Sequence, residues 1–499
     1  MLNEPFRPQY HFTPQAHWLN DPNGLVYYDG EYHLFYQYNP HDIVWGPMHW
    51  GHAVSPDLVN WTHLPIALYP DEVGQIFSGS MVIDWHNTAG LGRETMVAFF
   101  THENNGRQMQ SIAYSTDKGR TWTKYAGNPI LEPPNSGRDF RDPKVIWYGQ
   151  RESGHWLMVV VAGRIVLFYT SPDLINWTAS GEFGLTVGAT GGVWETPDLF
   201  ELPLDGGPDT RWVLAVAIGD GAPAGGSGMQ YFVGAFDGQV FTNENDKEIV
   251  LWADFGADFY APQSWSESPD GRRIWVAWMN NWRYANQVPA TTWRGGLTIP
   301  RGLSLTQMPE GVRLLQQPIG ELQAVRGREH TWFNETISPQ TNLLADIQGD
   351  ALEIIAAFSV EPGLKADRFG FRVRVGAVEM TTIGYATQEG KLFVDRRQSG
   401  QTDFCEMFAA VHEAETRPQN GLIHLHIFVD RHSVELFGNG GLVQITDQIF
   451  PASDSLGLEL FAAGGPIRVN RLTIYELNAA ATTSHKFLPE LTVLPDAAK

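Results

Sequence analysis

The segment SPDLVNWT at residues 55–62 recurs as STDKGRTWT at 115–123 and as SPDLINWT at 171–178. The copies share Ser-x-Asp, a short gap and Trp-Thr, and they begin 60 and 56 residues apart. A repeat of a few tens of residues is typical of solenoids, propellers and arrays. Each copy predicts a tight turn in which the Asp caps the local backbone and the Trp (Trp61, Trp122 or Trp177) packs against the repeating unit.

Short β-strands are predicted on both sides of each copy. The flanking stretches YHLFYQYN, TMVAFFTH, HWLMVVVAG and RWVLAVAIG are rich in β-branched and aromatic residues and are bounded by turn residues. Amphipathic helical patterns are nearly absent, which argues against an α/β barrel. Four-stranded units that repeat radially form a β-propeller, and units of about 60 residues give roughly five blades before residue 326. The periodicity alone leaves a large irregular sandwich open as the alternative.

The composition and the strand pattern of the sequence change near residue 326, where Trp and Pro become sparse and the predicted strands become regular. In LIHLHIFVD at 422–430, apolar residues alternate with His424 and His426, the period-2 pattern of a sheet with one buried face. Strands that recur with GNGG-type turns favour an antiparallel sandwich. We therefore predict an all-β chain with a propeller at 1–325, a β-sandwich at 326–480 and a C-terminal tail at 481–499.

Composition narrows the classes of function. The 499 residues include 34 Lys and Arg against 56 Asp and Glu, for a formal net charge of −22. Nucleic-acid binders and polybasic membrane-surface proteins need clustered cations, so neither class is expected and a neutral or cationic partner is favoured. The single Cys405 cannot form an intrachain disulfide and leaves the compartment open.

The N-terminal residues MLNEPFRPQY lack a secretory pattern, and no apolar stretch reaches the roughly 20 residues of a membrane helix. The chain is therefore expected to be soluble, either cytoplasmic as written or secreted with its signal removed. The sequence does not distinguish a monomer from a homodimer.

Two carboxylates precede proline in aromatic or turn-rich surroundings. Asp21 lies in WLNDPNG, which by itself is ordinary turn chemistry, and the sharper hypothesis is a buried nucleophile. Asp142 lies in FRDPKV, where Pro143 favours extended backbone and Arg141 favours the ionised carboxylate. A plain ion pair at a strand end is the competing interpretation for Asp142.

A third carboxylate, Glu195, follows Trp194 in GGVWETPDLF. Apolar and aromatic neighbours raise a carboxyl pKa, which suits a general acid, whereas an exposed edge-strand glutamate is the simpler interpretation. The stretches FYQYNP, WGPMHWGHAVS, IFSGS, DFYAPQSW and AWMNNW add flat aromatic faces among amides and hydroxyls. Such a surface binds a neutral polyol, and two carboxylates that flank a glycosidic bond hydrolyse it. The sequence thus favours a glycosidase.

The ordered set WLNDPNG, FYQYNP, WGPMHWGHAVS, FSGS, RDP, WETPD and DFYAPQSW resembles glycoside hydrolase family 32, the invertases, inulinases and levanases that cleave β-fructofuranosides. VDRHSVELFGNGG in the C-terminal part also resembles that family, so the resemblance covers nearly the whole chain. It implies a five-bladed propeller followed by a β-sandwich, in agreement with the repeat count.

The resemblance implies roles for individual residues. Asp21 would be the nucleophile, Glu195 the acid/base, and Asp142 the stabiliser of the transition state, with Arg141 beside it. Among the tryptophans, Trp18, Trp45, Trp194 and Trp278 are expected around the sugar. The residues that match the family's fructose pocket, together with Arg141, are Asn20, Gln37, Trp45, Phe77, Ser78, Tyr260 and Trp278.

The resemblance further implies a retaining mechanism, in which the carboxyl groups of Asp21 and Glu195 lie about 5 to 5.5 Å apart. The family usually has Cys after the acid/base glutamate, and this chain has Thr196, a departure that bears on how Glu195 is tuned. No metal or cofactor is expected: His49 and His52 would face opposite sides of a strand, and no HExxH helix is present.

The expected partner is a neutral, fructose-containing oligo- or polysaccharide. The preferred activity is exo-acting release of terminal fructose from levan or inulin, with sucrose also accepted. The alternatives are a sucrose-specific invertase, a fructosyltransferase of the same family and a non-catalytic fructan-binding protein. Inverting arabinan hydrolases share the architecture but lack the NDPNG and WE-x-PD contexts.

Overall fold

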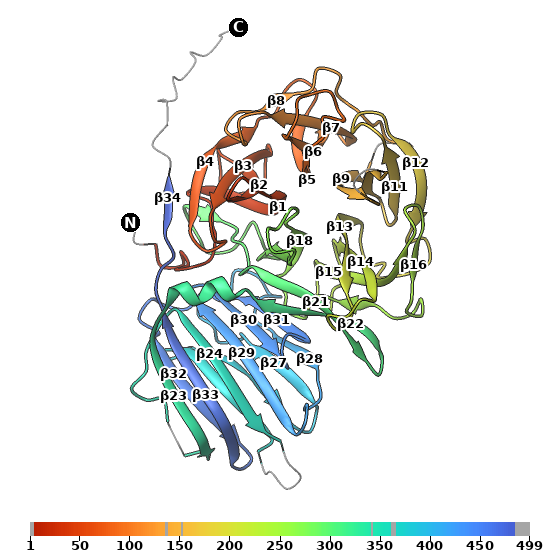
Figure 1. Ribbon diagram of the computed structural model, residues 1–499. Helices are drawn as coiled ribbons and strands as arrows, with labels where there is room; N and C mark the ends of the chain where they lie inside the picture. Colours follow the sequence, from red (N-terminus) through yellow and green to blue (C-terminus); the bar gives the residue numbers. More distant parts are fainter. Residues whose placement is uncertain (1–3, 135–137, 151–152, 341–342, 361–365, 485–499) are drawn as a thin grey trace, which may run out of the picture.

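The computed structural model describes residues 4–484 except 135–137, 151–152, 341–342 and 361–365. Five mainly antiparallel sheets surround a central axis, and two further sheets pack face to face beside them (Figure 1). The predicted five-bladed propeller followed by a β-sandwich is therefore confirmed, and the irregular sandwich is excluded.

Each blade is one sheet whose first strand lies nearest the axis (Figure 1). Blade I contains β1 (His17–Tyr28), β2 (Glu31–Asn39), β3 (His49–Ser55), β4 (Trp61–Leu68), β20 (Trp293–Arg294) and β34 (Thr482–Ser484). Blade II contains β5 (Gln75–Asp84), β6 (Thr95–Asn104), β7 (Arg107–Ser115) and β8 (Thr123–Lys124). Blade III contains β9 (Phe140–Tyr148), β10 (His155–Ala162), β11 (Val166–Ser171) and β12 (Thr178–Phe183).

The last two blades and a short helix complete the propeller. Blade IV contains β13 (Trp194–Pro203), β14 (Thr210–Ile218), β15 (Gly228–Phe236), β16 (Phe241–Asn243) and β17 (Leu251–Trp252). Blade V contains β18 (Tyr260–Ser264), β19 (Arg273–Trp278), β21 (Arg301–Met308) and β22 (Gly311–Pro318). The 3-10 helix η1 (Gly320–Val325) then leads to the sandwich. We propose η1 as the junction between domains at 1–325 and 326–480.

The repeated Ser-x-Asp box is the turn between the third and fourth strands of blades I, II and III. In the first copy, Asp57 Oδ1 accepts the backbone N–H groups of Val59 and Asn60 at 3.0 and 2.8 Å. Asp173 makes the equivalent bonds in the third copy. In the second copy, Asp117 accepts N–H groups one residue further along the chain, from Arg120 and Thr121. The prediction that each Asp caps its own turn is confirmed, because the interaction is local in sequence.

A β-bulge interrupts the first strand of every blade, near its start. The register between the first two strands shifts at Leu19/Pro22, at Ile76/Gly79, opposite Val159/Val161, at Glu195/Asp198 and at Tyr260/Gln263. Three of these bulges place a non-glycine residue at positive φ: Asp142 at 62°, Thr196 at 44° and Ala261 at 52°. A bulge leaves residues unpaired and re-aims their side chains, so five bulges at one level of the axis create a ring of polar groups there.

The sandwich consists of one six-stranded and one five-stranded sheet. The first contains β23 (Arg326–Ile337), β24 (Leu352–Ser359), β29 (Leu422–Asp430), β30 (Ser433–Gly438), β31 (Val443–Gln448) and β33 (Ile467–Leu477). The second contains β25 (Arg368–Val375), β26 (Thr381–Ala386), β27 (Lys391–Asp395), β28 (Val411–Glu415) and β32 (Gly457–Ala463). The predicted strand 422–430 is β29, and its alternation is as expected, with Leu425, Ile427 and Val429 buried.

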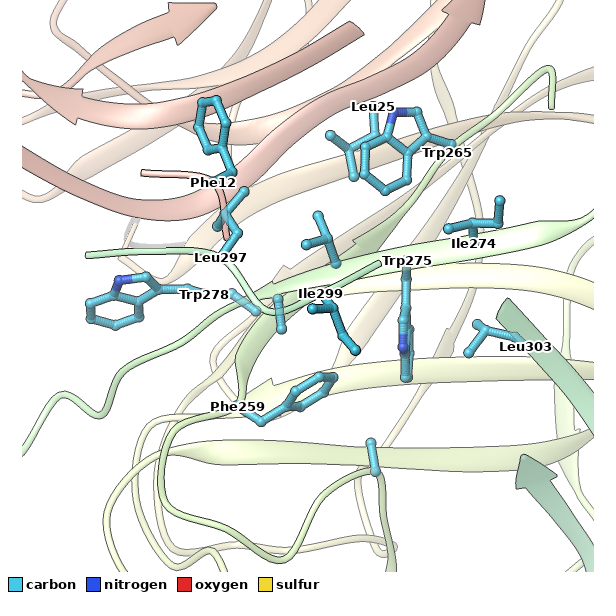
Figure 2. Close-up of a cluster of buried hydrophobic side chains, with 14 of the residues drawn as sticks. Phe12, Leu25, Phe259, Trp265, Ile274, Trp275, Trp278, Leu297, Ile299 and Leu303 are labelled. Atoms are coloured by element: carbon cyan, nitrogen blue, oxygen red, sulfur yellow. The ribbon is translucent and has the colours of Figure 1, made fainter. Parts of the chain in front are cut away.

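The largest apolar cluster fixes blade V to blade I and to the sandwich. Trp265, Trp275 and Ile299 lie at its centre, and Phe12 from the N-terminal segment packs over Leu297 (Figure 2). Phe428 and Phe437 of the sandwich belong to the same cluster, so the sheet face opposite the sandwich core is covered by the propeller. Of the predicted tail, residues 482–484 pair in parallel with β4, and residues 485–499 lie outside the described residues.

Candidate active site

A cavity of about 220 Å³ lies on the propeller axis at the level of the bulges. Nine of the eleven predicted site residues line it, and Trp282 is an addition. The nine are Asn20, Asp21, Gln37, Trp45, Phe77, Ser78, Arg141, Asp142 and Glu195. These nine residues, up to 175 positions apart, converge here because each inner strand starts at the same end of the axis.

Asp21 lies in the bulge of β1 and is buried. Ser78 Oγ, from the bulge of β5, donates a hydrogen bond to Asp21 Oδ2 at 2.6 Å, while Oδ1 has no partner among the described residues. Burial raises the pKa of Asp21 to about 6, the Ser78 hydrogen bond lowers it, and the nearby charge of Glu195 raises it. One oxygen of this carboxylate is therefore held, and the other is available to a ligand.

Asp142 lies in the bulge of β9, between Arg141 and Pro143. Its backbone N–H donates to Thr101 Oγ1 at 3.0 Å, and its Oδ2 accepts the N–H of Thr196 at 2.8 Å. Burial raises the pKa of Asp142 to about 7, against the lowering effect of the Arg141 guanidinium. The two interstrand hydrogen bonds hold Asp142 in a left-handed backbone conformation, with φ at 62°.

Glu195 carries the most polar contacts of the three carboxylates. Arg141 Nη2 donates to Glu195 Oε1 at 2.9 Å, and the hydroxyl of Tyr260 in β18 donates to Oε2. Arg141 also donates to Asp139 at 2.7 Å and lies 3.9 Å from Asp142 Oδ2. One guanidinium thus serves both Asp142 and Glu195, and the site holds three carboxylates for one cation.

Trp194 does not face the sugar pocket, and its expected place there is wrong. Its ring lies between blades III and IV beside Phe232, and its Nε1 donates to Ala189 O at 3.0 Å. Adjacent side chains of a strand point to opposite faces, so a Glu195 that faces the axis turns Trp194 away from it. Glu195 is consequently surrounded by Arg141 and Tyr260 rather than by an indole.

The remaining predicted aromatic residues form a wall behind the cavity. Trp278 is fully buried and packs on Trp282, with ring centroids 4.7 Å apart, so Trp282 is the residue exposed to the cavity. Trp18 stacks on the same Trp282 ring and donates to Asn20 Oδ1 at 2.8 Å. Tyr260 reaches the site through its hydroxyl alone. Trp282 ends the quoted stretch AWMNNW, so the motif identified the wall but not which tryptophan faces the cavity.

Two further residues brace the site, and sequence reasoning missed both. Thr101 accepts the Asp142 N–H and donates to Gln110 Oε1 at 2.7 Å, and Gln110 Nε2 in turn donates to Phe140 O at 2.8 Å. Both side chains are buried on the middle strands of blade II. Both residues are recognisable only by their hydrogen bonds to the first strand of the next blade, and no local sequence pattern predicts such contacts.

No group of three or more His, Cys, Asp or Glu side chains is placed to hold a metal ion in the part of the chain that the structure describes. Within the same residues, no helix has the length and apolar character needed to cross a bilayer.

Comparisons with known proteins agree with this geometry. The sequence model of the Glycosyl hydrolases family 32 N-terminal domain matches residues 11–318, and that of the Glycosyl hydrolases family 32 C terminal matches residues 321–476. The chain is 56% identical to a levanase of Bacillus subtilis (strain 168), over 98% of this chain and 73% of that protein. It is 38% identical to an extracellular exo-inulinase of Aspergillus awamori, over 95% of each chain.

Solved structures extend the similarity to three dimensions. The crystal structure of exo-inulinase from Aspergillus awamori superposes with a TM-score of 0.90 at 37% identity, over 96% of this chain and 99% of that one. The β-fructofuranosidase from Schwanniomyces occidentalis, complexed with fructosyl-erythritol, superposes with a TM-score of 0.87 at 31% identity, over 95% and 98% of the two chains.

Proposed function

The chain belongs to glycosyl hydrolase family 32, and from that premise we propose that it is an exo-acting fructan β-fructosidase. It would release terminal β-D-fructofuranosyl units from levan and inulin, and would also accept sucrose. The observation that carries the proposal is the meeting of Asp21, Asp142 and Glu195 around one small cavity. The similarity to a levanase and to exo-inulinases supports fructans as the substrate class.

In the proposed mechanism, Glu195 protonates the departing glycosidic oxygen while Asp21 attacks the anomeric carbon of fructose. A fructosyl-enzyme forms through an oxocarbenium-like transition state, and water activated by Glu195 then releases fructose with retention of configuration. The partnerless Oδ1 of Asp21 supports its role as nucleophile, because Ser78 orients the carboxylate through the other oxygen. Asp142 accepts hydrogen bonds from the fructosyl hydroxyls, and Arg141 holds Glu195 and Asp142 at a fixed spacing.

The charge balance of the site suits a proton donor. Burial raises the pKa of Asp21 to about 6 and that of Asp142 to about 7, so the cavity holds a proton more readily near neutral pH than water does. The proposed mechanism starts with Asp21 ionised and with Glu195 carrying the proton that it donates. Arg141 and Tyr260 fix the Glu195 carboxyl, since each contacts a different oxygen.

The size of the cavity supports exo action. Pockets that enclose drug-sized ligands measure about 300 to 1,000 Å³, so one of about 220 Å³ suits a single terminal sugar rather than the interior of a chain. Half-exposed Trp45 packs edge to face against Phe77, with centroids 6.0 Å apart, and borders the cavity on the solvent side.

Product analysis on levan and inulin tests the proposal. Fructose as the sole early product is expected, whereas a ladder of oligosaccharides would show endo action. Stereochemistry is followed by NMR on a fresh reaction, where the first-formed fructose should be the β anomer. An α anomer as first product would exclude Asp21 as nucleophile.

A further inference from the structure

A second cavity, of about 520 Å³, lies at the other end of the propeller axis. We call it the far pocket and define it by Trp85, Thr88, Trp147, Trp156, Ser266 and Arg273. The active-site residues lie near the first residues of the inner strands, whereas the far pocket is lined by the last residues of β5 and β9 and by the segment after β18. At about 3.3 Å per residue, Asp142 and Trp147 are roughly 16 Å apart along β9.

A buried polar layer separates the far pocket from the active site. Lys144 Nζ lies 3.0 Å from Asp198 Oδ1 and donates to Ser264 O at 3.1 Å, and Asp198 Oδ2 accepts the Ser264 N–H at 2.7 Å. All three residues are buried, and they come from blades III, IV and V. The far pocket is therefore a separate cavity rather than an extension of the catalytic one.

The aromatic walls of the far pocket are fixed in place. Trp156 Nε1 donates to Thr88 Oγ1 at 2.9 Å, and Trp147 packs edge to face on Trp156 with centroids 5.0 Å apart. Trp85 packs edge to face on Tyr28, with centroids 5.8 Å apart. Asp84 caps the loop that carries Trp85 and Thr88 by accepting the Thr88 N–H at 2.9 Å. These rings would lose little conformational freedom when a ligand binds.

Polar groups lie among the rings. The Arg273 guanidinium donates from Nη1 to Trp265 O at 3.2 Å, and its plane lies over the Phe200 ring at 5.3 Å. Glu267 supplies an opposite charge to the same lining, and Thr88 and Ser266 supply hydroxyls. Flat indole faces with hydroxyls and one charge of each sign match a neutral polyol better than an anion or a lipid.

We propose that the far pocket is a non-catalytic binding site for a neutral oligosaccharide, namely a segment of the fructan chain that the active site shortens. The identification of the sugar as a fructan rests on the proposed function. The far pocket has more than twice the volume of the active-site cavity and so takes more than one sugar unit. Binding there raises the effective concentration of chain ends near the enzyme, a gain that applies to polymers and not to sucrose.

The test uses the Trp85→Ala/Trp147→Ala double variant, with Trp332→Ala as the control. Trp332 is a half-buried tryptophan on β23 of the sandwich, remote from both cavities. Retardation is measured by electrophoresis in gels that contain levan or inulin, and KM is measured for levan and for sucrose. We expect the double variant to bind polymer about fivefold more weakly and to raise KM for levan, with sucrose turnover unchanged.

Unchanged retardation together with an unchanged KM for levan would overturn the proposal. If the double variant does not fold, hydrogen exchange on the Asp21→Ala protein with added inulin oligosaccharide takes its place. Protection of amides in 82–88 and 145–148 supports the far pocket, and exchange unchanged there overturns it. The two proposals fail differently: a wild-type protein that hydrolyses neither sucrose nor levan refutes the proposed function, whereas the far pocket is judged by binding alone.

Discussion

Of the clusters of buried charge among the described residues, one lies on the propeller axis and another lies where the propeller meets the sandwich. The catalytic cluster consists of Asp21, Asp142, Glu195 and Arg141. The interface cluster consists of His11, Arg301, Asp430 and Glu435, whose side chains are all nearly inaccessible to solvent. Both bring together residues from distant parts of the sequence, yet their hydrogen bonding differs.

The two carboxylates of the interface cluster are saturated with partners. Arg301 Nη2 donates to Glu435 Oε2 at 2.6 Å, and His11 lies between Glu435 and Asp430 at 2.9 and 2.7 Å. The backbone N–H of Gln9 donates to Asp430, and the backbone N–H of Ile299 donates to Glu435. These contacts lower the pKa of Asp430 and of Glu435 in spite of burial, and raise the pKa of His11 to about 9.

The catalytic cluster lacks such saturation, and burial raises the pKa of Asp21 and of Asp142. Asp254, which shares Arg301 with the interface cluster, shows that the distinction is not absolute, because burial raises its pKa as well. Its two oxygens are nevertheless fully engaged by Arg301, Gly256 and Thr446. Unmet hydrogen-bonding capacity that faces a cavity, rather than burial of charge as such, therefore distinguishes the proposed nucleophile Asp21 from a structural carboxylate.

The largest expected effect comes from removing the nucleophile. Asp21→Ala should lower kcat on sucrose by about 10⁴-fold or more, since no other group can form the fructosyl-enzyme. The measurement is fructose release by the purified variant. The control is Asp237→Ala, an exposed turn carboxylate of the same domain, which should keep wild-type turnover. Turnover by Asp21→Ala within tenfold of wild type would contradict the assignment.

The interface cluster should respond in stability instead. Glu435→Gln removes one of the two buried counter-charges from Arg301, which keeps Asp254, and from His11, which keeps Asp430. We expect a loss of roughly 3 kcal/mol in the free energy of unfolding. Urea denaturation measures it. Glu459→Gln breaks a half-exposed ion pair with Arg372 on the sandwich and should cost less than about 1 kcal/mol. Equal effects of the two substitutions would show that the interface cluster contributes no more to stability than a half-exposed ion pair.

Sequence reasoning succeeded where contacts are local and failed where they are not. The capped turns follow from Asp and N–H groups two to four residues apart, and the bulges contain the Asp-Pro, Thr-Pro and Ala-Pro pairs of the quoted motifs. The interface cluster joins His11 to Asp430 across 419 positions, which no local pattern encodes. The sequence pointed to Trp278 and not to Trp282 for a related reason, because which ring lines the cavity depends on how the two rings pack.

The two clusters should also respond oppositely to pH. The folded-state pKa of Asp21, about 6, exceeds the ordinary 3.8, so its contribution to stability is complete below about pH 4 and is lost as pH rises through 6. That loss is on the order of 3 kcal/mol. Asp430, with its pKa lowered, contributes stability that is lost as pH falls.

Asp21→Asn should therefore stabilise the protein at pH 7 and have little effect at pH 4. The difference in the free energy of unfolding between this variant and wild type, followed from pH 4 to 7, measures the cost of the charge. Asp430→Asn provides the opposite arm, because its destabilisation should shrink toward acid pH. A difference for Asp21→Asn that does not vary with pH would mean that the carboxylate is not strained by burial.

The smallest expected effect comes from removing the hydrogen bond that Ser78 donates to Asp21. Ser78 donates to Asp21 Oδ2 at 2.6 Å and thereby lowers its pKa, so Ser78→Ala should raise that pKa and move the acid limb of kcat/KM to higher pH by up to about one unit. Ser80→Ala is the matched control on the same strand, since the Ser80 hydroxyl contacts Pro143 O rather than a carboxylate and should leave the limb in place. If the acid limb moves equally in both variants, the shift arises from a general loosening of β5. If it moves only in Ser78→Ala, the shift arises from loss of the hydrogen bond to Asp21.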